Sequence, residues 1–377
     1  MKIALITIHH ANSYGGTLQA LASQNVLSRY GDVNIIDYKS KELENTLKLI
    51  RVDSNPRSIL RAGKDFFRIL PRRRLIAKFR EFMRVHYKLT PACQDLQTLQ
   101  KLSSGFDCVV CGSDQIWNPM ITGELDLNYM LAFSRAKKKI SFSSSAGSYR
   151  YSDEEELKVR KALSTFDSIS VREEDTAQRL RSMLGNQKID HTLDPTLMLN
   201  KQEWMQSLGL FSQAPGNDDK YILVYTLKKD ALVRETIDRI KSVLGFRVVA
   251  IDQDPFLGYK SDRHIMDASP VDYVSLFANA SFVITNSFHG TAFALNFGVP
   301  FVTALPESGL NRIKGLLDKV GLADRLVSNL NDVNSVVVKP INFTHSHQQL
   351  EALRQVTWNY LDGALASNTV TKPIEVS

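Results

Sequence analysis

The sequence predicts an α/β protein made of two Rossmann-like doubly wound domains that face a cleft. The chain has 377 residues, which is long for one hydrophobic core. Short apolar runs rich in β-branched residues alternate with helical patterns, as in parallel sheets covered by helices. A polar segment from Ser212 to Lys220 separates two such series. We therefore expect an N-terminal domain over residues 1–211 and a C-terminal domain over 212–377, ending in a long helix and a flexible tail.

The first domain opens with a strand, a polar loop and a helix. The apolar run from Lys2 to Ile8 reaches two histidines without a cleavage site, so we interpret it as a buried strand and not a signal peptide. The paired glycines of the loop let a backbone approach a ligand, but they do not form GxGxxG, so a dinucleotide site is not indicated. The loop residues predicted to bind a ligand are His10, Asn12, Tyr14, Gly15 and Gly16.

A second strand of this domain, Phe106 to Cys111, also ends in a polar loop. The side chains predicted to hydrogen-bond sugar hydroxyls there are Ser113, Asp114, Gln115 and Asn118. The alternative is a turn in which these side chains cap the next helix. Both interpretations stay open from the sequence.

Arg172 leaves a short strand just before an acidic helix start. It either anchors that helix through Glu174 or Asp175, or faces the crevice and binds an anion.

The stretch from Phe282 to Phe301 predicts a strand, a polar turn and a helix. In such a turn the free amides of the helix suit an anion. We expect Gly290 to allow the turn and Thr291 to cap the helix. His289 is the side chain of this turn that can carry a proton near neutral pH.

The formal net charge of +7 is unevenly distributed. Residues 57–88 hold eleven lysines and arginines against two acidic residues, inside a predicted helical insertion over about 51–90 that Pro71 should interrupt. This face is either simply solvated, or contacts an anionic membrane or an acidic partner. A nucleic-acid partner is not expected, because no reading motif accompanies the basic patch.

Three cysteines and no apolar run of membrane-spanning length favour a cytoplasmic protein, with the basic segment able to place it at the inner face of the cytoplasmic membrane. Asp252-Gln253-Asp254 matches a metal-binding DxD, but three-letter matches are common, so we expect no metal and no cofactor.

Five segments in order resemble the polysaccharide pyruvyl transferase family. They are Asn12-Ser13-Tyr14-Gly15-Gly16, Asp107 to Asn118, Ser170-Val171-Arg172-Glu173, Leu193-Asp194-Pro195-Thr196 and Asn286-Ser287-Phe288-His289-Gly290-Thr291. The resemblance runs from about residue 1 to 330. It implies a GT-B-like fold and transfer of the pyruvyl group of phosphoenolpyruvate to two hydroxyls of a sugar in a surface polysaccharide or its lipid-linked precursor.

By this resemblance His289 is the active-site histidine and Arg172 the anion-binding arginine. Asn286, Ser287, Gly290 and Thr291 would bind the donor, and the first domain would bind the acceptor. Many members carry arginine where this chain has Ser287, so the charge must come from elsewhere, with Arg312 and Lys314 as candidates.

Two other functions remain open from the sequence. One is a nucleotide-sugar glycosyltransferase on the same architecture, and the other is a non-catalytic glycan-binding protein. The acceptor sugar and the oligomeric state are not specified by these residues.

Overall fold

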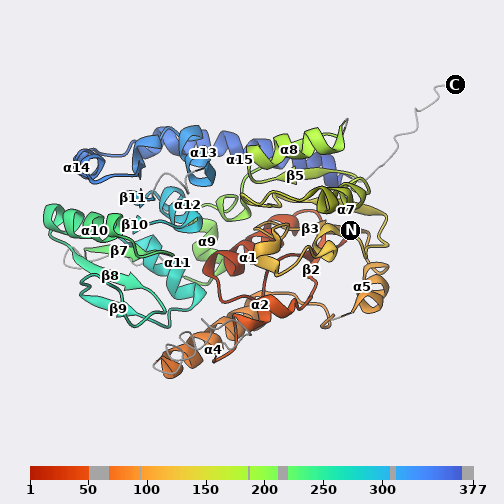
Figure 1. Ribbon diagram of the computed structural model, residues 1–377, viewed down its shortest axis with the longest axis horizontal. Coiled ribbons are helices and arrows are strands. Elements are labelled where there is room, and N and C mark those ends of the chain that lie inside the picture. Colours follow the sequence, from red (N-terminus) through yellow and green to blue (C-terminus); the bar gives the residue numbers. More distant parts are fainter. Residues whose placement is uncertain (51–67, 94, 186, 211–219, 306–310, 367–377) are drawn as a thin grey trace.

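The computed structural model describes residues 1–50, 68–93, 95–185, 187–210, 220–305 and 311–366, and it contains two parallel sheets side by side (Figure 1). The linker predicted from Ser212 lies outside these residues except for Lys220, as do the first part of the basic insertion and the C-terminal tail. The N-terminal half holds a sheet of order β2-β1-β3-β4, and the C-terminal half a sheet of order β12-β11-β10-β7-β8-β9.

In the N-terminal half, β1 (Lys2–Ile6) lies between β2 (Asp32–Ile35) and β3 (Cys108–Cys111), and β4 (Lys138–Ser141) follows β3. Isolated bridges such as Ser144 to Val171 extend the sheet to the pair β5 (Ile169–Val171) and β6 (Ile189–His191). The helices of this half are α1 (Tyr14–Leu27), α2 (Lys41–Asn45), α4 (Ile69–His86), α5 (Leu96–Ser103), α6 (Pro119–Thr122), α7 (Asp153–Leu163), α8 (Glu174–Leu184) and α9 (Lys201–Ser207), with 3-10 turns η1 (Leu127–Met130) and η2 (Pro195–Leu197).

The C-terminal half repeats the strand-helix alternation. Its strands are β7 (Tyr221–Tyr225), β8 (Arg247–Ile251), β9 (Arg263–Ile265), β10 (Phe282–Thr285), β11 (Phe301–Ala304) and β12 (Leu326–Val327). Its helices are α10 (Ala231–Leu244), α11 (Pro270–Asn279), α12 (Phe288–Phe297), α13 (Asn311–Lys319), α14 (Leu330–Val338) and α15 (Phe343–Leu365), with the 3-10 turn η4 (Ala323–Arg325). The strands are apolar because helices cover both faces of a parallel sheet.

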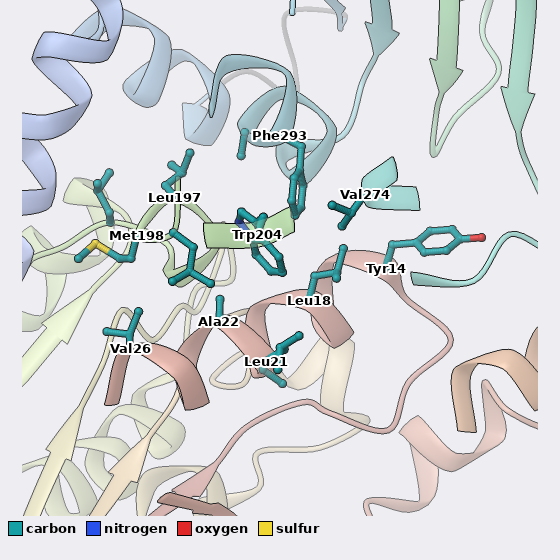
Figure 2. Close-up of a cluster of buried hydrophobic side chains, with 14 of the residues drawn as sticks. Tyr14, Leu18, Leu21, Ala22, Val26, Leu197, Met198, Trp204, Val274 and Phe293 are labelled. Atoms are coloured by element: carbon teal, nitrogen blue, oxygen red, sulfur yellow. The ribbon is translucent and has the colours of Figure 1, made fainter. Parts of the chain in front are cut away.

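A hydrophobic cluster joins the two halves around α1. Figure 2 shows side chains of α1 such as Leu18 pointing toward Trp204 of α9, Phe293 of α12 and Val274 of α11. Trp204 is fully buried, its ring lies 5.2 Å from that of Phe293, and its Nε1 donates to the carbonyl of Thr196 at 3.0 Å. Because α1 is buried almost all round, its apolar residues are not confined to one stripe.

The last helix, α15, crosses from the C-terminal half back to the N-terminal half. Tyr360 donates to the carbonyl of Ser141 at 2.5 Å, and Thr357 accepts from the amide of Leu193 at 3.0 Å. The chain therefore ends its described part packed against the first sheet, which restrains the two halves relative to each other.

The helix α4 forms the described part of the basic insertion. Pro71 lies in its first turn, where the missing amide costs no intrahelical hydrogen bond. The residues before Arg68, where a preceding helix was expected, lie outside the described part. The buried apolar residues of α4, including Phe79 and Phe82, belong to the core, whereas Leu70 and Val85 are exposed. Arg74 pairs with Asp267 at 2.8 Å across the halves. Among the helices in the described ranges, none has the length and apolarity that a membrane span requires.

Candidate active site

Arg172 lies in a buried group of carboxylates directly after β5. Its Nη1 donates to Oδ2 of Asp194 at 2.7 Å, and its Nε donates to Oε1 of Glu173 at 3.0 Å. Oδ1 of Asp114 is 3.8 Å from the same Nη1. The guanidinium lies over the ring of Phe288 at 4.8 Å from its centroid. Its Nη2 is buried and has no hydrogen-bond partner in the described part of the chain.

The charges of this cluster are mutually stabilised. Burial alone would lower the pKa of Arg172, but the carboxylates of Glu173, Asp194 and Asp114 raise it above its ordinary value. Burial alone would raise the pKa of Asp194, but His289, Arg172 and Thr196 hold it well below its usual range. The site therefore keeps a guanidinium cation beside a carboxylate anion near neutral pH.

His289 reaches this cluster from the opposite half, in the first turn of α12. Its Nε2 is 3.7 Å from Oδ2 of Asp194, and no hydrogen-bond partner for Nε2 is found within the described ranges. The side chain is 13% exposed, so the imidazole is held in place yet reachable. His289 thus lies next to a buried carboxylate of the other half.

Gly15 of α1 packs against the imidazole of His289. A methyl group built on Gly15 would collide with the ring atoms, including Nδ1. At Gly16 the nearest polar atom is Oδ2 of Asp114, 3.5 Å from where a methyl carbon would lie. The glycine pair therefore brings the first turn of α1 against the cluster of Arg172, Asp114, Asp194 and His289.

Two helix N-termini meet at this point. Ser13 caps α1 by accepting from the amide of Gly16, and Ser287 caps α12 by accepting from the amide of Gly290. The other amides of a first turn have no partner within the helix, and the helix dipole is positive there. The junction between α1 and α12 is therefore suited to an anion.

The expected helix cap at Thr291 is wrong. The structure has Ser287 as the cap, and Thr291 is buried one turn later with its hydroxyl on the carbonyl of Ser287 at 3.0 Å and on Thr303 at 2.8 Å. Asn286 also has an internal role, accepting from the amide of Leu227 at 2.7 Å. Thr291 and Asn286 thus hold the turn.

Gly290 is required by packing. A methyl group there would overlap the hydroxyl of Thr285 at the end of β10. That hydroxyl accepts from the amide of Ser287 at 3.1 Å and donates to the carbonyl of Tyr225. The close approach of helix to strand is what places His289 at the sheet edge.

The loop after β3 divides between the site and the fold. Asp114 faces Arg172, and Ser113 is fully buried, with its hydroxyl 2.8 Å from the carbonyl of Ser143 and 3.4 Å from Oδ2 of Asp194. Gln115 accepts from Asn118, which also caps α6. Of the two interpretations of this loop, Asn118 therefore follows the one in which the side chain caps the next helix.

The loop after β1 divides in the same way. Tyr14 is buried, donates to the carbonyl of Ala268 at 2.8 Å and stacks on Tyr273. Asn12 and Gln253 exchange two side-chain hydrogen bonds, at 2.7 and 3.1 Å, across the halves. These two loop residues tie the halves together, while Gly15 and Gly16 lie at the site.

His10 lies away from the cluster, on a cavity of about 920 Å³ beside α2 and α4. Burial and the neighbouring His9 lower the pKa of His10 to about 3, against smaller raising effects from Asp37 and the Ser40 backbone. Neither ring nitrogen makes a hydrogen bond to the described residues. The basic side chains on this cavity are Lys39, Lys48, Arg73, Arg80 and Arg84, against Asp37 and Glu44.

Of the two candidate cations of α13, Arg312 and Lys314, the structure describes the side chain of Lys314 alone. The side chain of Arg312 lies outside the described part. Lys314 is 57% exposed and pairs with Asp318 at 2.7 Å on the same helix.

Asp252 of the DxD segment pairs with Lys229 at 2.9 Å. Within the described ranges no group of His, Cys, Asp and Glu side chains is arranged to hold a metal ion.

Sequence reasoning missed the contacts of Asp194 and Glu173 with Arg172, although both residues stand in segments that carried the resemblance. Asp194 also caps η2 through the amide and hydroxyl of Thr196. An aspartate between an apolar residue and a proline suggests a cap, so the sequence offered no separate signal for its contact with Arg172. Lys319 of α13 was missed as well; it lies 2.8 Å from Nδ1 of His191.

The same fold occurs in solved nucleotide-sugar epimerases. The structure is similar to the UDP-GlcNAc 2-epimerase from Methanocaldococcus jannaschii, with a TM-score of 0.54 and 13% identity over 95% of this chain and 100% of that one. It is also similar to the epimerase from Neisseria meningitidis solved with UDP-GlcNAc, with a TM-score of 0.52 and 13% identity over 95% and 94% of the two chains. These likenesses confirm the predicted GT-B-like α/β fold. A search of curated proteins found no match.

The family model for polysaccharide pyruvyl transferase matches residues 14–307. The chain therefore belongs to the polysaccharide pyruvyl transferase family, as its motifs indicated, and it is a transferase that uses a donor and a sugar acceptor.

Proposed function

We propose that this protein transfers the pyruvyl group of phosphoenolpyruvate to two hydroxyls of a sugar in a surface polysaccharide or its precursor, forming a pyruvate ketal. The observation that carries the proposal is the meeting of His289 with Asp194 and Arg172, contributed by opposite halves of the chain. A proton carrier, an ionised carboxylate and a buried guanidinium at two helix N-termini fit a reaction of an anionic enol phosphate.

The chemistry requires one proton to move onto the methylene carbon of phosphoenolpyruvate. This leaves a cationic centre at the adjacent carbon, which one sugar hydroxyl attacks. Phosphate then leaves and the second hydroxyl closes the ketal. The two hydroxyl protons balance the proton taken by the methylene carbon and the proton carried away by hydrogen phosphate. A positioned acid and base typically contributes about 10²- to 10⁴-fold.

His289 is assigned to the proton transfer and Arg172 to the carboxylate or phosphate of the donor. Asp194 places a carboxylate 3.7 Å from Nε2 of the imidazole that would donate the proton to the methylene carbon. The buried Nη2 of Arg172 is the donor group of this guanidinium that remains for a ligand. Phe288 supports the flat face of the guanidinium.

The acceptor is assigned to the N-terminal half. The concavity beside His10 is lined by basic and apolar side chains and opens at the carboxyl ends of β1 and β2, where ligands of α/β sheets bind. The basic face of α4 that borders it is proposed to meet the anionic surface of the cytoplasmic membrane. The core packing of Phe79 and Phe82 means that this contact would be electrostatic and not an insertion of the helix.

The test is phosphate release from phosphoenolpyruvate in the presence of candidate sugars, with His289→Ala and His289→Gln beside the wild type. We expect both variants to lose at least about 100-fold in kcat while keeping the wild-type circular dichroism spectrum. Wild-type turnover by His289→Ala would refute the role of His289. Protection against thermal unfolding by UDP-sugars and not by phosphoenolpyruvate would instead support a nucleotide-sugar transferase.

A further inference from the structure

A cavity of about 160 Å³ lies beside Arg172 and is lined by residues from both halves. Arg172 and His191 contribute from the carboxyl ends of β5 and β6, and Phe288 comes from the start of α12. Lys319 of α13 is also part of its wall. The cavity is therefore continuous with the cluster that holds His289.

Lys319 and His191 form a directed chain of hydrogen bonds on this wall. Nε2 of His191 is 2.9 Å from the backbone carbonyl of Arg172, which only accepts, so Nε2 carries the hydrogen. Nδ1 then has a lone pair, and it accepts from Nζ of Lys319 at 2.8 Å. His191 is neutral in this arrangement, and it holds the ammonium group of Lys319 across the boundary between the halves.

The electrostatic environment agrees with this geometry. Burial lowers the pKa of His191, and the charge of Lys319 lowers it further. An ammonium has three donors, and His191 uses one of them. At least one N–H of Lys319 thus remains for a ligand in the cavity.

The carboxylates that line the cavity have arginine partners already. Asp194 and Glu173 pair with Arg172, Glu174 pairs with Arg181 at 2.9 Å, and Asp175 lies 3.3 Å from Arg179 and 3.5 Å from Arg150. What these pairs leave open are Nη2 of Arg172, the ammonium of Lys319 and Oε2 of Glu173, which is buried without a hydrogen-bond partner among the described residues. Two cationic groups with donors to spare, on one small cavity, suit a phosphate.

We propose that this cavity is the subsite for the phosphate group of the phosphorylated donor, with Lys319 as its ligand beside Arg172 and with His191 as the residue that positions Lys319. The inference rests on the proposed pyruvyl transfer and extends it. It also assigns the positive charge that Ser287 does not supply, because Lys319 approaches the start of α12 from a different helix.

The experiment compares Lys319 with a lysine outside the cavity. Lys319→Met should raise the KM for phosphoenolpyruvate at least about tenfold, since a charge-assisted hydrogen bond contributes roughly 1.5–3 kcal/mol. Lys319→Arg should recover most of the affinity. Lys158→Met removes an equal charge from an exposed ion pair on α7 and should leave KM unchanged. Equal KM values for Lys319→Met and the wild type would overturn the proposal, as would an equal effect of Lys158→Met.

The positioning role of His191 has its own readout. His191→Phe removes the acceptor for Lys319, so KM should rise while kcat changes less than threefold. A fall in thermal stability with an unchanged KM would show a merely structural role and overturn the assignment.

Binding measurements separate this proposal from the proposed reaction. Inorganic phosphate and phosphoenolpyruvate should each raise the melting temperature of the wild type, and Lys319→Met should lose most of that shift. If the shift depends on Lys319 but no sugar yields phosphate release, the anion subsite stands and pyruvyl transfer fails. If neither anion shifts the wild type, or if Lys319→Met shifts as much as the wild type, the subsite is refuted.

Discussion

Gly15 of α1 and His289 of α12 lie so close that any side chain at residue 15 would overlap the imidazole. The two residues belong to opposite halves of the chain, and the contact determines where the ring lies relative to Asp194. His289 can therefore occupy its position only if residue 15 is glycine.

Gly15→Ala should displace His289 and lower kcat by about 100-fold, because a shift of about 1 Å in a reacting group has effects of that size. The measurement is phosphate release from phosphoenolpyruvate. Gly363→Ala in α15 is the control, since a methyl group there meets open space and alanine favours a helix. Full activity of Gly15→Ala would show that His289 does not need its present position.

Arg172→Met should lower the free energy of unfolding by about 3–5 kcal/mol at pH 7, because it leaves buried carboxylates without their cation. The difference in the free energy of unfolding between Arg172→Met and the wild type should become smaller at acid pH. In the wild type the depressed pKa of Asp194 contributes stability above the ordinary aspartate pKa, and that stability is lost only as the pH falls toward the depressed value. Without Arg172 the pKa of Asp194 rises, so the carboxyl takes up a proton earlier.

Urea unfolding of Arg172→Met at pH 3 and pH 7 measures this difference. Adding Asp194→Asn to Arg172→Met should recover part of the lost stability at pH 7. A deficit that is equal at both pH values, or a double variant less stable than the single one, would contradict the charge argument.

His10→Gln should make the protein less sensitive to acid. The pKa of His10 is lowered to about 3 in the fold, so the unfolded chain takes up a proton below about pH 6.5 while the folded chain does not. The stability that His10 contributes is complete above that pH and decreases as the pH falls toward 3. At pH 5 the loss is about 2 kcal/mol, from about 1.36 kcal/mol for each pH unit.

Chemical unfolding between pH 5 and 7 tests the role of His10. The slope of stability against pH should be smaller in His10→Gln than in the wild type, and His345→Gln at an exposed position should leave it unchanged. Identical slopes for His10→Gln and the wild type would show that His10 titrates normally.

Trp204→Ala should destabilise the junction of the halves by about 3–5 kcal/mol, because it opens a cavity between α1 and α12 and leaves the carbonyl of Thr196 without the indole donor. Thermal and urea unfolding measure the effect. Leu227→Ala, at a side chain 67% exposed, is the comparison and should change stability by less than about 0.5 kcal/mol. Similar midpoints for both variants would contradict the packing in Figure 2.

The fold class was predictable because its signals are local. Runs such as Phe282 to Thr285 are apolar throughout, as buried parallel strands are, and each is followed by a polar turn and a helix. The packing of α15 against the first sheet was not predictable, since it depends on pairs such as Tyr360 and Ser141 that are far apart in the chain.

The site was predictable where a residue stands alone in a turn, as His289 and Arg172 do. The loops were harder, because polar residues of the same types divide between the site and internal hydrogen bonds. Asp114 faces Arg172, while Asn118, four residues later, caps a helix. Only the three-dimensional course of the loop decides between the two. Lys319 had no signal in the sequence, because its partner His191 belongs to the other half.

The pairing of Gly15 with His289 constrains how this protein and its relatives can exchange parts. In a hybrid that joins the N-terminal half of one relative to the C-terminal half of another, the histidine comes from one parent. The residue that packs against its imidazole comes from the other. Residue 15 then decides compatibility: a parent with any larger residue there would exclude the histidine of its new partner, however well each half folds. Exchange of the N-terminal half between relatives would thus require glycine at this position.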